Sequence, residues 1–383
     1  MAMPAIFRSF FQGGFECSTL RLPDGRQRDL LESTRHARHA ERDYRALAEL
    51  GIHTVRDGVR WHLIEERPGI YDLGSFLPQL DAATRTGTQV IWDLCHYGWP
   101  GHLDIWSPEF PQAFARFAAQ IAAVVRDRSP QPPIYCPMNE ISFWAWGGGE
   151  MAYIGPCALG RGNELKQQLV RACLAAMDVI RLVDSRARFV LADPIIRVVP
   201  QTPADAADAA GHTAAQYQAW DMLAGRERPE LGGGPGYLDI IGVNFYPHNQ
   251  WFLDGPTIRR GEPAYTPLRE LLAEIHDRYG RPILIAETGA EGPRRAGWLR
   301  YVAEEVASAL ADGLPILGIC LYPVTDYPGW DDDRHCPTGL LGLANEHGAR
   351  PIDGLTAAEL AVQRQCIADV IATSTQAAAE PLR

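Results

Sequence analysis

The chain has 383 residues, a length that suits either one large domain or two smaller ones. It carries 36 Lys and Arg residues against 47 Asp and Glu residues, which gives a formal net charge of −11. Because the acidic residues are spread along the chain, its surface would repel a phosphate backbone, and we expect no nucleic-acid partner. The 46% of hydrophobic and 22% of charged residues are typical of a soluble globular protein.

The first residues, MAMPAIFRSFFQGG, lack the basic region, long apolar run and small-residue cleavage site of a secretory signal. No stretch of the sequence approaches the roughly 18 consecutive apolar residues of a membrane helix. We therefore expect a cytoplasmic protein with no membrane partner. The sequence leaves the oligomeric state open, and a homodimer is among the alternatives.

Short apolar runs alternate with longer amphipathic segments along the chain. The apolar runs predict eight strands, over residues 8–14, 52–58, 88–95, 133–138, 188–193, 238–244, 282–287 and 315–322. The amphipathic segments predict helices over residues 35–50, 108–127, 164–185, 266–279 and 295–312, with a last helix near 356–375. Eight such units predict the α/β class and a (β/α)8 TIM barrel. No linker divides the sequence, so we expect residues 1–383 to form a single barrel domain.

In a parallel barrel the carboxyl ends of all strands meet at one mouth, and chemistry is placed there. Thirteen polar or aromatic residues follow the predicted strands at this end: Glu16, Arg56, Asp93, His96, Asn139, Glu140, Asp193, Asn244, Tyr246, Glu287, Tyr322, Asp326 and Trp330. Polar groups directly behind apolar runs need one another or a ligand as partners. Carboxylate, amide and aromatic side chains gathered around one barrel mouth indicate a sugar pocket.

Two glutamates at this mouth form a pair. Glu140 ends the fourth predicted strand and Glu287 ends the seventh, and these strands lie on opposite sides of a barrel. Hydrolysis of a glycosidic bond with retention of configuration needs two carboxyl groups about 5–5.5 Å apart, one protonated and one ionised. Either glutamate alone is as readily a surface residue, but together they predict a retaining glycoside hydrolase.

Six segments carry motifs in the order and at the intervals that a barrel requires: RDGVRWHLIEERPGIYDLGSF, LCHYGWP, MNE, GVNFYP, IAETG and GICLYPVTDYPGW. Together they resemble the strand-end motifs of glycoside hydrolase family 1, which belongs to the clan of retaining barrel β-glycosidases. The resemblance runs over most of the chain. It implies a (β/α)8 barrel that cleaves a terminal β-linked sugar by a double displacement.

The resemblance also implies a role for each residue around the pair. Glu140 would be the acid/base and Glu287 the nucleophile. Arg56 would keep the nucleophile ionised, since an opposite charge within a few ångströms depresses a carboxyl pKa. Tyr246 would donate a hydrogen bond to the same carboxylate, and Asn139 would hold the sugar 2-hydroxyl. For Arg56, a salt bridge to a carboxylate of its own segment is the structural alternative.

The sugar pocket departs from the family pattern. Glu16 stands where the family has a sugar-binding Gln, Tyr322 where it has a Trp, and Gly329 where it has a Glu that binds two hydroxyls. His96 and Trp330 are retained. A pocket that loses a hydroxyl acceptor usually loses the corresponding sugar by a large factor. We therefore expect a sugar other than plain glucose or galactose, with Glu16 supplying an acceptor from the other side of the pocket.

Three further residues are expected to contact the sugar. Asn244 lies in the GVNFYP motif, and Trp144 follows the acid/base residue closely enough to offer a ring face to the substrate, as does Trp146. The predicted function is thus a retaining β-glycosidase of the β-glucosidase type, whose partner is a small-molecule glycoside.

Three alternatives stay open at this point. A transglycosidase would use the same two glutamates with an alcohol as acceptor, and a non-catalytic sugar-binding barrel would keep the fold without the reaction. A metal-dependent barrel hydrolase is the third, suggested by Asp93 and His96. These two residues have no further ligands at matching spacing, and none of the eight cysteines stands in a Cys-x-x-Cys pair. We therefore expect neither a metal nor another cofactor.

Overall fold

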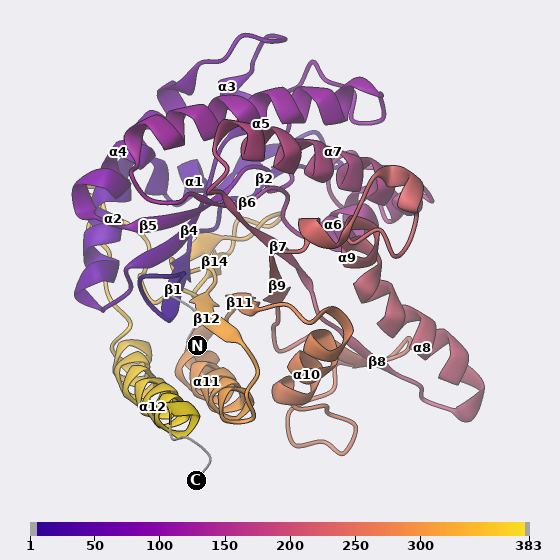
Figure 1. Cartoon of the computed structure of the whole chain (residues 1–383), viewed down its shortest axis with the longest axis vertical. Coiled ribbons are helices and arrows are strands. Elements are labelled where there is room, and N and C mark those ends of the chain that lie inside the picture. Colours follow the sequence, from indigo (N-terminus) through magenta and orange to yellow (C-terminus); the bar gives the residue numbers. More distant parts are fainter. Residues whose placement is uncertain (1–5, 380–383) are drawn as a thin grey trace.

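The chain folds into a closed barrel of eight parallel strands (Figure 1). The computed structural model describes residues 6–379. Around the barrel the strands follow the order β1-β12-β11-β9-β7-β6-β5-β4, and β1 pairs with β4 to close it. They are β1 (Phe11–Gly14), β4 (Thr54–Gly58), β5 (Gln89–Asp93), β6 (Ile134–Cys136), β7 (Arg188–Pro194), β9 (Ile240–Asn244), β11 (Ile283–Thr288) and β12 (Ile316–Leu321). Each lies within or beside a predicted strand, so the predicted TIM barrel is confirmed.

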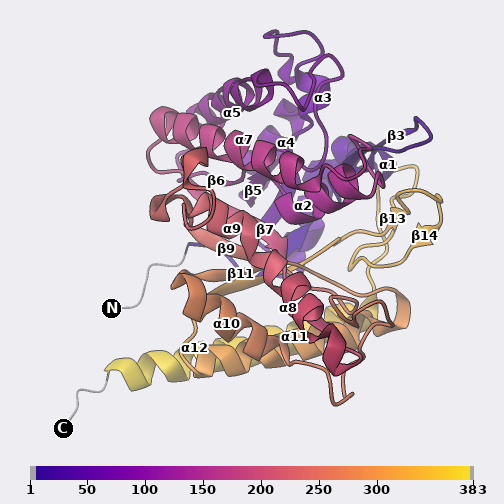
Figure 2. The same cartoon turned by 90° about the vertical axis from the view of Figure 1, so that its right-hand side faces the viewer.

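Helices surround the barrel on its outside (Figures 1 and 2). The long ones are α2 (His36–Glu49), α4 (Leu77–Thr86), α5 (Glu109–Arg128), α7 (Gly162–Val183), α10 (Leu268–Tyr279), α11 (Arg295–Ala311) and α12 (Gly354–Ala379). Shorter ones are α1 (Leu30–Ser33), α3 (Trp61–Ile64), α6 (Ile141–Trp144), α8 (Ala206–Ala214) and α9 (Gln218–Leu223). None of the helices among residues 6–379 has the length and apolarity needed to cross a bilayer.

Three two-stranded sheets extend the loops that leave the carboxyl ends of the barrel strands. They pair β2 (Thr19–Arg21) with β3 (Gln27–Asp29), β8 (Arg197–Val199) with β10 (Gln250–Phe252), and β13 (Tyr327–Pro328) with β14 (His335–Cys336). Figure 2 shows β3, β13 and β14 together at one end of the molecule. These additions build walls around the barrel mouth, which is where the polar side chains gather.

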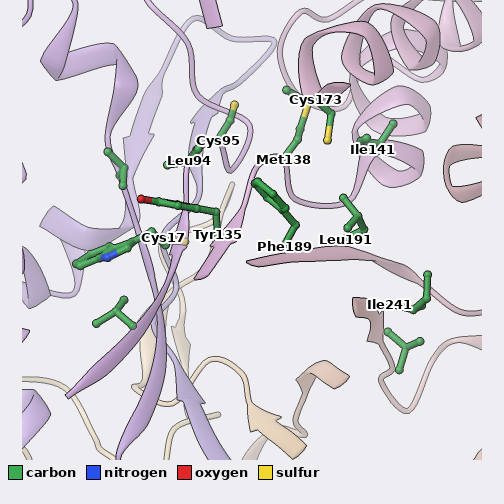
Figure 3. Packing of buried hydrophobic residues seen from close by; sticks show 14 of the residues in the cluster. Cys17, Leu94, Cys95, Tyr135, Met138, Ile141, Cys173, Phe189, Leu191 and Ile241 are labelled. Atoms are coloured by element: carbon green, nitrogen blue, oxygen red, sulfur yellow. The ribbon is translucent and has the colours of Figure 1, made fainter. Parts of the chain in front are cut away.

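The strands divide their side chains between two apolar layers. Ile91, Ile134, Val190, Ile240 and Leu284 belong to a cluster that fills the barrel. Their neighbours along the strands belong to the second layer, which packs against the helices; Figure 3 shows it around β6 and β7, with Tyr135, Phe189, Leu191, Met138 and Cys173. Successive residues of a strand point to opposite faces. A residue that continues the inner face beyond the apolar layer therefore reaches the mouth.

A buried ion cluster ties α2 to the barrel. His36 Nδ1 lies 2.7 Å from an Asp43 oxygen and its Nε2 lies 2.9 Å from an Asp57 oxygen. Arg350 contacts Asp43 at 2.8 Å from the opposite side. Burial lowers the pKa of His36, but the charges and hydrogen bonds of the two aspartates more than offset it and raise that pKa above its ordinary value. His36 is therefore the cation that holds two buried carboxylates.

We expect His36→Gln to lower the free energy of unfolding by about 3–5 kcal/mol near pH 6, because the two carboxylates would keep only Arg350 as a cation. Since the folded pKa is raised, the contribution of His36 is complete below about pH 6.5 and is lost as the pH rises through the folded value. The urea midpoint of the wild type should fall over that range more steeply than that of the variant. Replacing the exposed His53 in the same way should leave the slope unchanged, and equal slopes in His36→Gln and the wild type would contradict the assignment.

Candidate active site

Strand alternation carries three polar side chains to the barrel mouth. Arg56 follows Thr54 at a spacing of two on β4, and Asp93 follows Ile91 on β5. Asn244 lies four residues after Ile240 on β9. All three side chains are completely buried. The inward-facing side chains of these strands thus change from apolar to polar at the carboxyl ends of the strands.

Glu287 reaches the mouth by an irregularity of β11. Leu284 and Ala286 belong to the inner cluster, so strict alternation would turn Glu287 toward the helices. The register of β11 against β9 shifts between Ile285 and Glu287, and Glu287 pairs with Asn244 of β9. A shift of this kind re-aims the side chain that follows it. The Glu287 carboxylate therefore lies inside the mouth and contacts Arg56.

Arg56 joins the buried groups of the mouth. Its Nη1 donates to Glu287 Oε1 at 2.8 Å, and its Nε donates to Asp93 Oδ1 at 2.8 Å. Its Nη2 lies 2.8 Å from the other Asp93 oxygen and donates to Asn139 Oδ1. The guanidinium thus pairs with carboxylates from strands β5 and β11, and the alternative of a salt bridge within its own segment is wrong.

These contacts determine which nitrogen of a neutral His96 ring accepts a hydrogen bond. Because Asn139 Oδ1 accepts from Arg56, the amide group presents its NH2 to the other side, where Nδ2 lies 2.9 Å from His96 Nε2. An amide NH2 only donates, so Nε2 accepts and carries no proton. The ring proton is then on Nδ1, which lies 3.2 Å from an Asp93 oxygen. The hydrogen bonds thus place the proton of a neutral ring on Nδ1. Burial lowers the pKa of His96, but the nearby carboxylates of Asp93, Glu287 and Glu16 raise it above its ordinary value.

Glu140 follows β6 in a left-handed backbone conformation, with a φ of 45°. Such a conformation is uncommon for a residue with a side chain. The Glu140 N–H donates to the Ala192 carbonyl at 2.9 Å, which holds the residue against the end of β7. Its carboxylate accepts from Asn244 Nδ2 at 2.8 Å and from the Tyr97 hydroxyl. Tyr97 also has a positive φ, of 69°.

The two glutamates have different partners. Glu287 accepts from the Arg56 cation and from the Tyr246 hydroxyl at 2.8 Å. Among the described residues, no Lys, Arg or His forms an ion pair with Glu140, whose partners are neutral donors. Burial raises the pKa of Glu140, and it raises the pKa of Glu287 to about 7, with Arg56 opposing and Glu140 adding to the rise. The pair therefore shares a proton near neutral pH.

A cavity of about 2050 Å³ opens in front of the two glutamates. It exceeds the several hundred ångströms cubed of an ordinary small-ligand pocket, so it has room for more than one sugar ring. The predicted residues Glu16, His96, Tyr322 and Trp330 line it together with Glu140, Glu287 and Tyr246. Glu16, His96 and Tyr322 are at least nine-tenths buried. Four of the expected sugar contacts thus lie on the cavity wall.

The expected contact from Trp144 is wrong. Its ring is completely buried, packs against Tyr97 and Trp99, and donates from Nε1 to the Gly155 carbonyl at 2.7 Å. Trp146 lies two residues further along the same helical segment, is 50% exposed and lines the cavity. Two residues on a helix point to nearly opposite sides, so only one of two such tryptophans can face the substrate.

Asn139 and Asn244 do not line the cavity, since both are completely buried behind it. Asn139 contacts Arg56 and His96, and Asn244 contacts Glu140. They hold other residues rather than offering themselves to a ligand. The sequence also gave no role to Tyr97, although it stands directly after His96 in LCHYGWP.

One group of three potential metal ligands occurs among the described residues, formed by Cys17, Asp93 and His96. The Asp93 oxygen that faces the other two lies 2.8 Å from Arg56 Nη2. The guanidinium already supplies the positive charge at that oxygen. The donor set therefore does not fit a resident metal ion.

The fold and the site define a TIM barrel whose mouth holds one glutamate after β6, another on β11 and a buried arginine on β4. No protein-family model and no curated protein sequence matches the chain. Several solved structures, in contrast, have a similar fold. A hyperthermophilic β-glucosidase mutant aligns with a TM-score of 0.76 at 16% identity over 94% of this chain and 100% of the other.

A β-glucosidase from Thermotoga maritima aligns with a TM-score of 0.75 at 15% identity, over 95% of this chain and 99% of that one. A structure described as the family 1 β-glucosidase from the same organism gives a TM-score of 0.70 at 16% identity, over 86% of each chain. At these identities the likeness concerns the fold. The chain has the barrel of the family 1 β-glucosidases.

We expect Arg56→Met to lower the free energy of unfolding by about 3–5 kcal/mol, because Asp93 and Glu287 would stay buried without their cation. Adding Asp93→Asn should recover part of the loss, since it removes one of the two uncompensated charges. Urea unfolding at neutral pH measures both effects. Arg85→Met, at an exposed arginine paired with Glu41, is the control and should change stability little. An Arg56→Met protein as stable as that control would contradict this account of the mouth.

Proposed function

We propose that the protein is a retaining β-glycosidase that hydrolyses a terminal β-linked sugar by a double displacement. The observation that carries the proposal is that the two carboxylates have different partners. Glu287 is paired with the Arg56 cation, whereas Glu140 has only neutral partners. An adjacent cation favours the ionised form of a carboxyl group. The shared proton therefore stays on Glu140, which gives one ionised nucleophile and one acid, as the retaining reaction requires.

In the first step an ionised Glu287 oxygen attacks the anomeric carbon. The bond from this carbon to the leaving oxygen breaks, and Glu140 gives its proton to that oxygen. Tyr246 and Arg56 hold the attacking carboxylate from two sides. The product of this step is a glycosyl ester on Glu287, with Glu140 ionised.

In the second step water attacks the anomeric carbon. Glu140 takes a proton from this water, the new bond to its oxygen forms, and Glu287 leaves as a carboxylate. Asn244 supports both states of Glu140, because its Oδ1 has no partner among the described residues while its Nδ2 donates to Glu140. A half turn of the amide replaces the donor by an acceptor when Glu140 carries its proton.

Glu287→Ala should abolish hydrolysis of nitrophenyl β-glycosides, because no carboxylate would remain to form the ester. Azide should restore turnover and give the α-glycosyl azide, since it enters the space of the missing side chain and attacks from that face. Glu140→Ala is the matched variant, expected to slow poor leaving groups by about 100- to 10,000-fold and to give the β-glycosyl azide. Chromatography and NMR identify the azides. Ordinary activity in Glu287→Ala would show that the mechanism is wrong.

Tyr97→Phe and Tyr246→Phe should change the pH profile of kcat/KM in different ways. Each hydroxyl donates to a carboxylate and so stabilises its ionised form. Removing Tyr97 should raise the pKa of the acid and move the alkaline limb up by roughly one pH unit, which widens the profile. Removing Tyr246 should raise the pKa of the nucleophile and move the acidic limb up, which narrows the profile. The assignment of acid and nucleophile would be reversed if the two variants exchanged these effects.

A further inference from the structure

Glu16 is a buried carboxylate of the cavity wall that lacks a counter-charge. Its side chain is 3% exposed and lines the cavity beside Glu287. Its Oε1 accepts from the Ser18 N–H at 3.1 Å. Among residues 6–379, no Lys, Arg or His forms an ion pair with it. The carboxylate thus keeps acceptor capacity that faces the cavity.

The neighbouring charges do not compensate for it. Four buried carboxyl groups surround Arg56 and His96: Glu16, Asp93, Glu140 and Glu287. Arg56 forms its ion pairs with Asp93 and Glu287. His96 forms its ion pair with Asp93 and not with Glu16. With Glu140 holding a proton, the carboxylates of Glu16, Asp93 and Glu287 outnumber Arg56 and a protonated His96, and Glu16 is the one that forms no ion pair.

A buried charge without a partner is costly, so Glu16 needs either a proton or a positively charged ligand. Burial raises the pKa of Glu16, in keeping with that need. A carboxylate can accept from a sugar hydroxyl, but only a cationic donor also neutralises its buried charge. A carboxylate only accepts when it is ionised. It is therefore suited to a cationic donor on the ligand.

We propose that Glu16 binds a positively charged amino group on the terminal sugar, so that the substrates are β-glycosides of amino sugars. This inference rests on the proposed function, because it concerns the sugar that occupies the same site. The ammonium group would lie in the cavity beside Glu16 and offset the charge of its carboxylate. Trp330 lines the same cavity and is available to contact the rest of that sugar.

Binding tests this inference without requiring hydrolysis. The probes are glucose and galactose, and their derivatives in which a single hydroxyl at C2, C3, C4 or C6 is replaced by an amine. Titration calorimetry of the full chain slightly below neutral pH should give at least one derivative a Kd about 100-fold below that of its parent sugar. Glu16→Gln keeps the oxygen that accepts from Ser18 but removes the charge, and it should abolish this preference.

Glu150→Gln is the matched control, because Glu150 is an exposed carboxylate of the same cavity and the preference should survive there. The inference is overturned if no amino derivative binds better than its parent. It is equally overturned if the preference persists in Glu16→Gln, since the amine would then be held by other carboxylates. Thermal unfolding of both variants confirms that they are folded.

Hydrolysis of the matching nitrophenyl β-glycosides separates this inference from the proposed function. If the wild type binds an amino sugar through Glu16 but cleaves none of the glycosides, the proposed function fails and the binding site stands. Cleavage of neutral and amino glycosides at equal kcat/KM, with no change in Glu16→Gln, would leave the proposed function standing and overturn the amino-sugar inference.

Discussion

The contact of the Arg56 guanidinium with Asp93 and Glu287 is the interaction on which the barrel mouth depends. Both carboxylates are buried, and burial of an unpaired charge costs several kilocalories per mole. One planar cation with donors on three sides satisfies both of them and also orients Asn139. A lysine would carry the same charge but could not direct three hydrogen bonds in one plane. The geometry of the arginine therefore determines where Asp93, Glu287 and Asn139 lie.

The effect of Arg56 passes through a chain of hydrogen bonds. Because Arg56 takes the oxygen of Asn139, the amide donates to His96, and the ring must keep its proton on the Asp93 side. A single tautomer follows from the position of one guanidinium. The electrostatic character of the cavity follows in turn, since the carboxylates of Glu16, Asp93 and Glu287 outnumber the cations even when His96 is protonated. The charges of the sugar pocket and of the two reacting glutamates are thus coupled to one another.

Irregular backbone positions the reacting groups. Glu140 and Tyr97 both have left-handed φ angles, and β11 shifts its register just before Glu287. Residues held in such conformations each cost about 1–3 kcal/mol and persist only where the surroundings determine them. Here the surroundings are the end of β7, which binds the Glu140 N–H, and the ring of tyrosine and asparagine donors. The regular part of each strand builds the barrel, and its last residue departs from regularity to build the site.

The sequence by itself determined the eight strands, because apolar runs of strand length at regular intervals have few other ways to be buried. It also placed Glu140 and Glu287 at strand ends, since each directly follows such a run, and identified Arg56 and Tyr246 by their motifs. Only the tertiary structure decided which side chains face the cavity. Helical geometry buried Trp144 and exposed Trp146, and a positive φ brought Tyr97 to Glu140. Such directions depend on backbone angles and on partners far apart in the chain, which no local pattern of residues encodes.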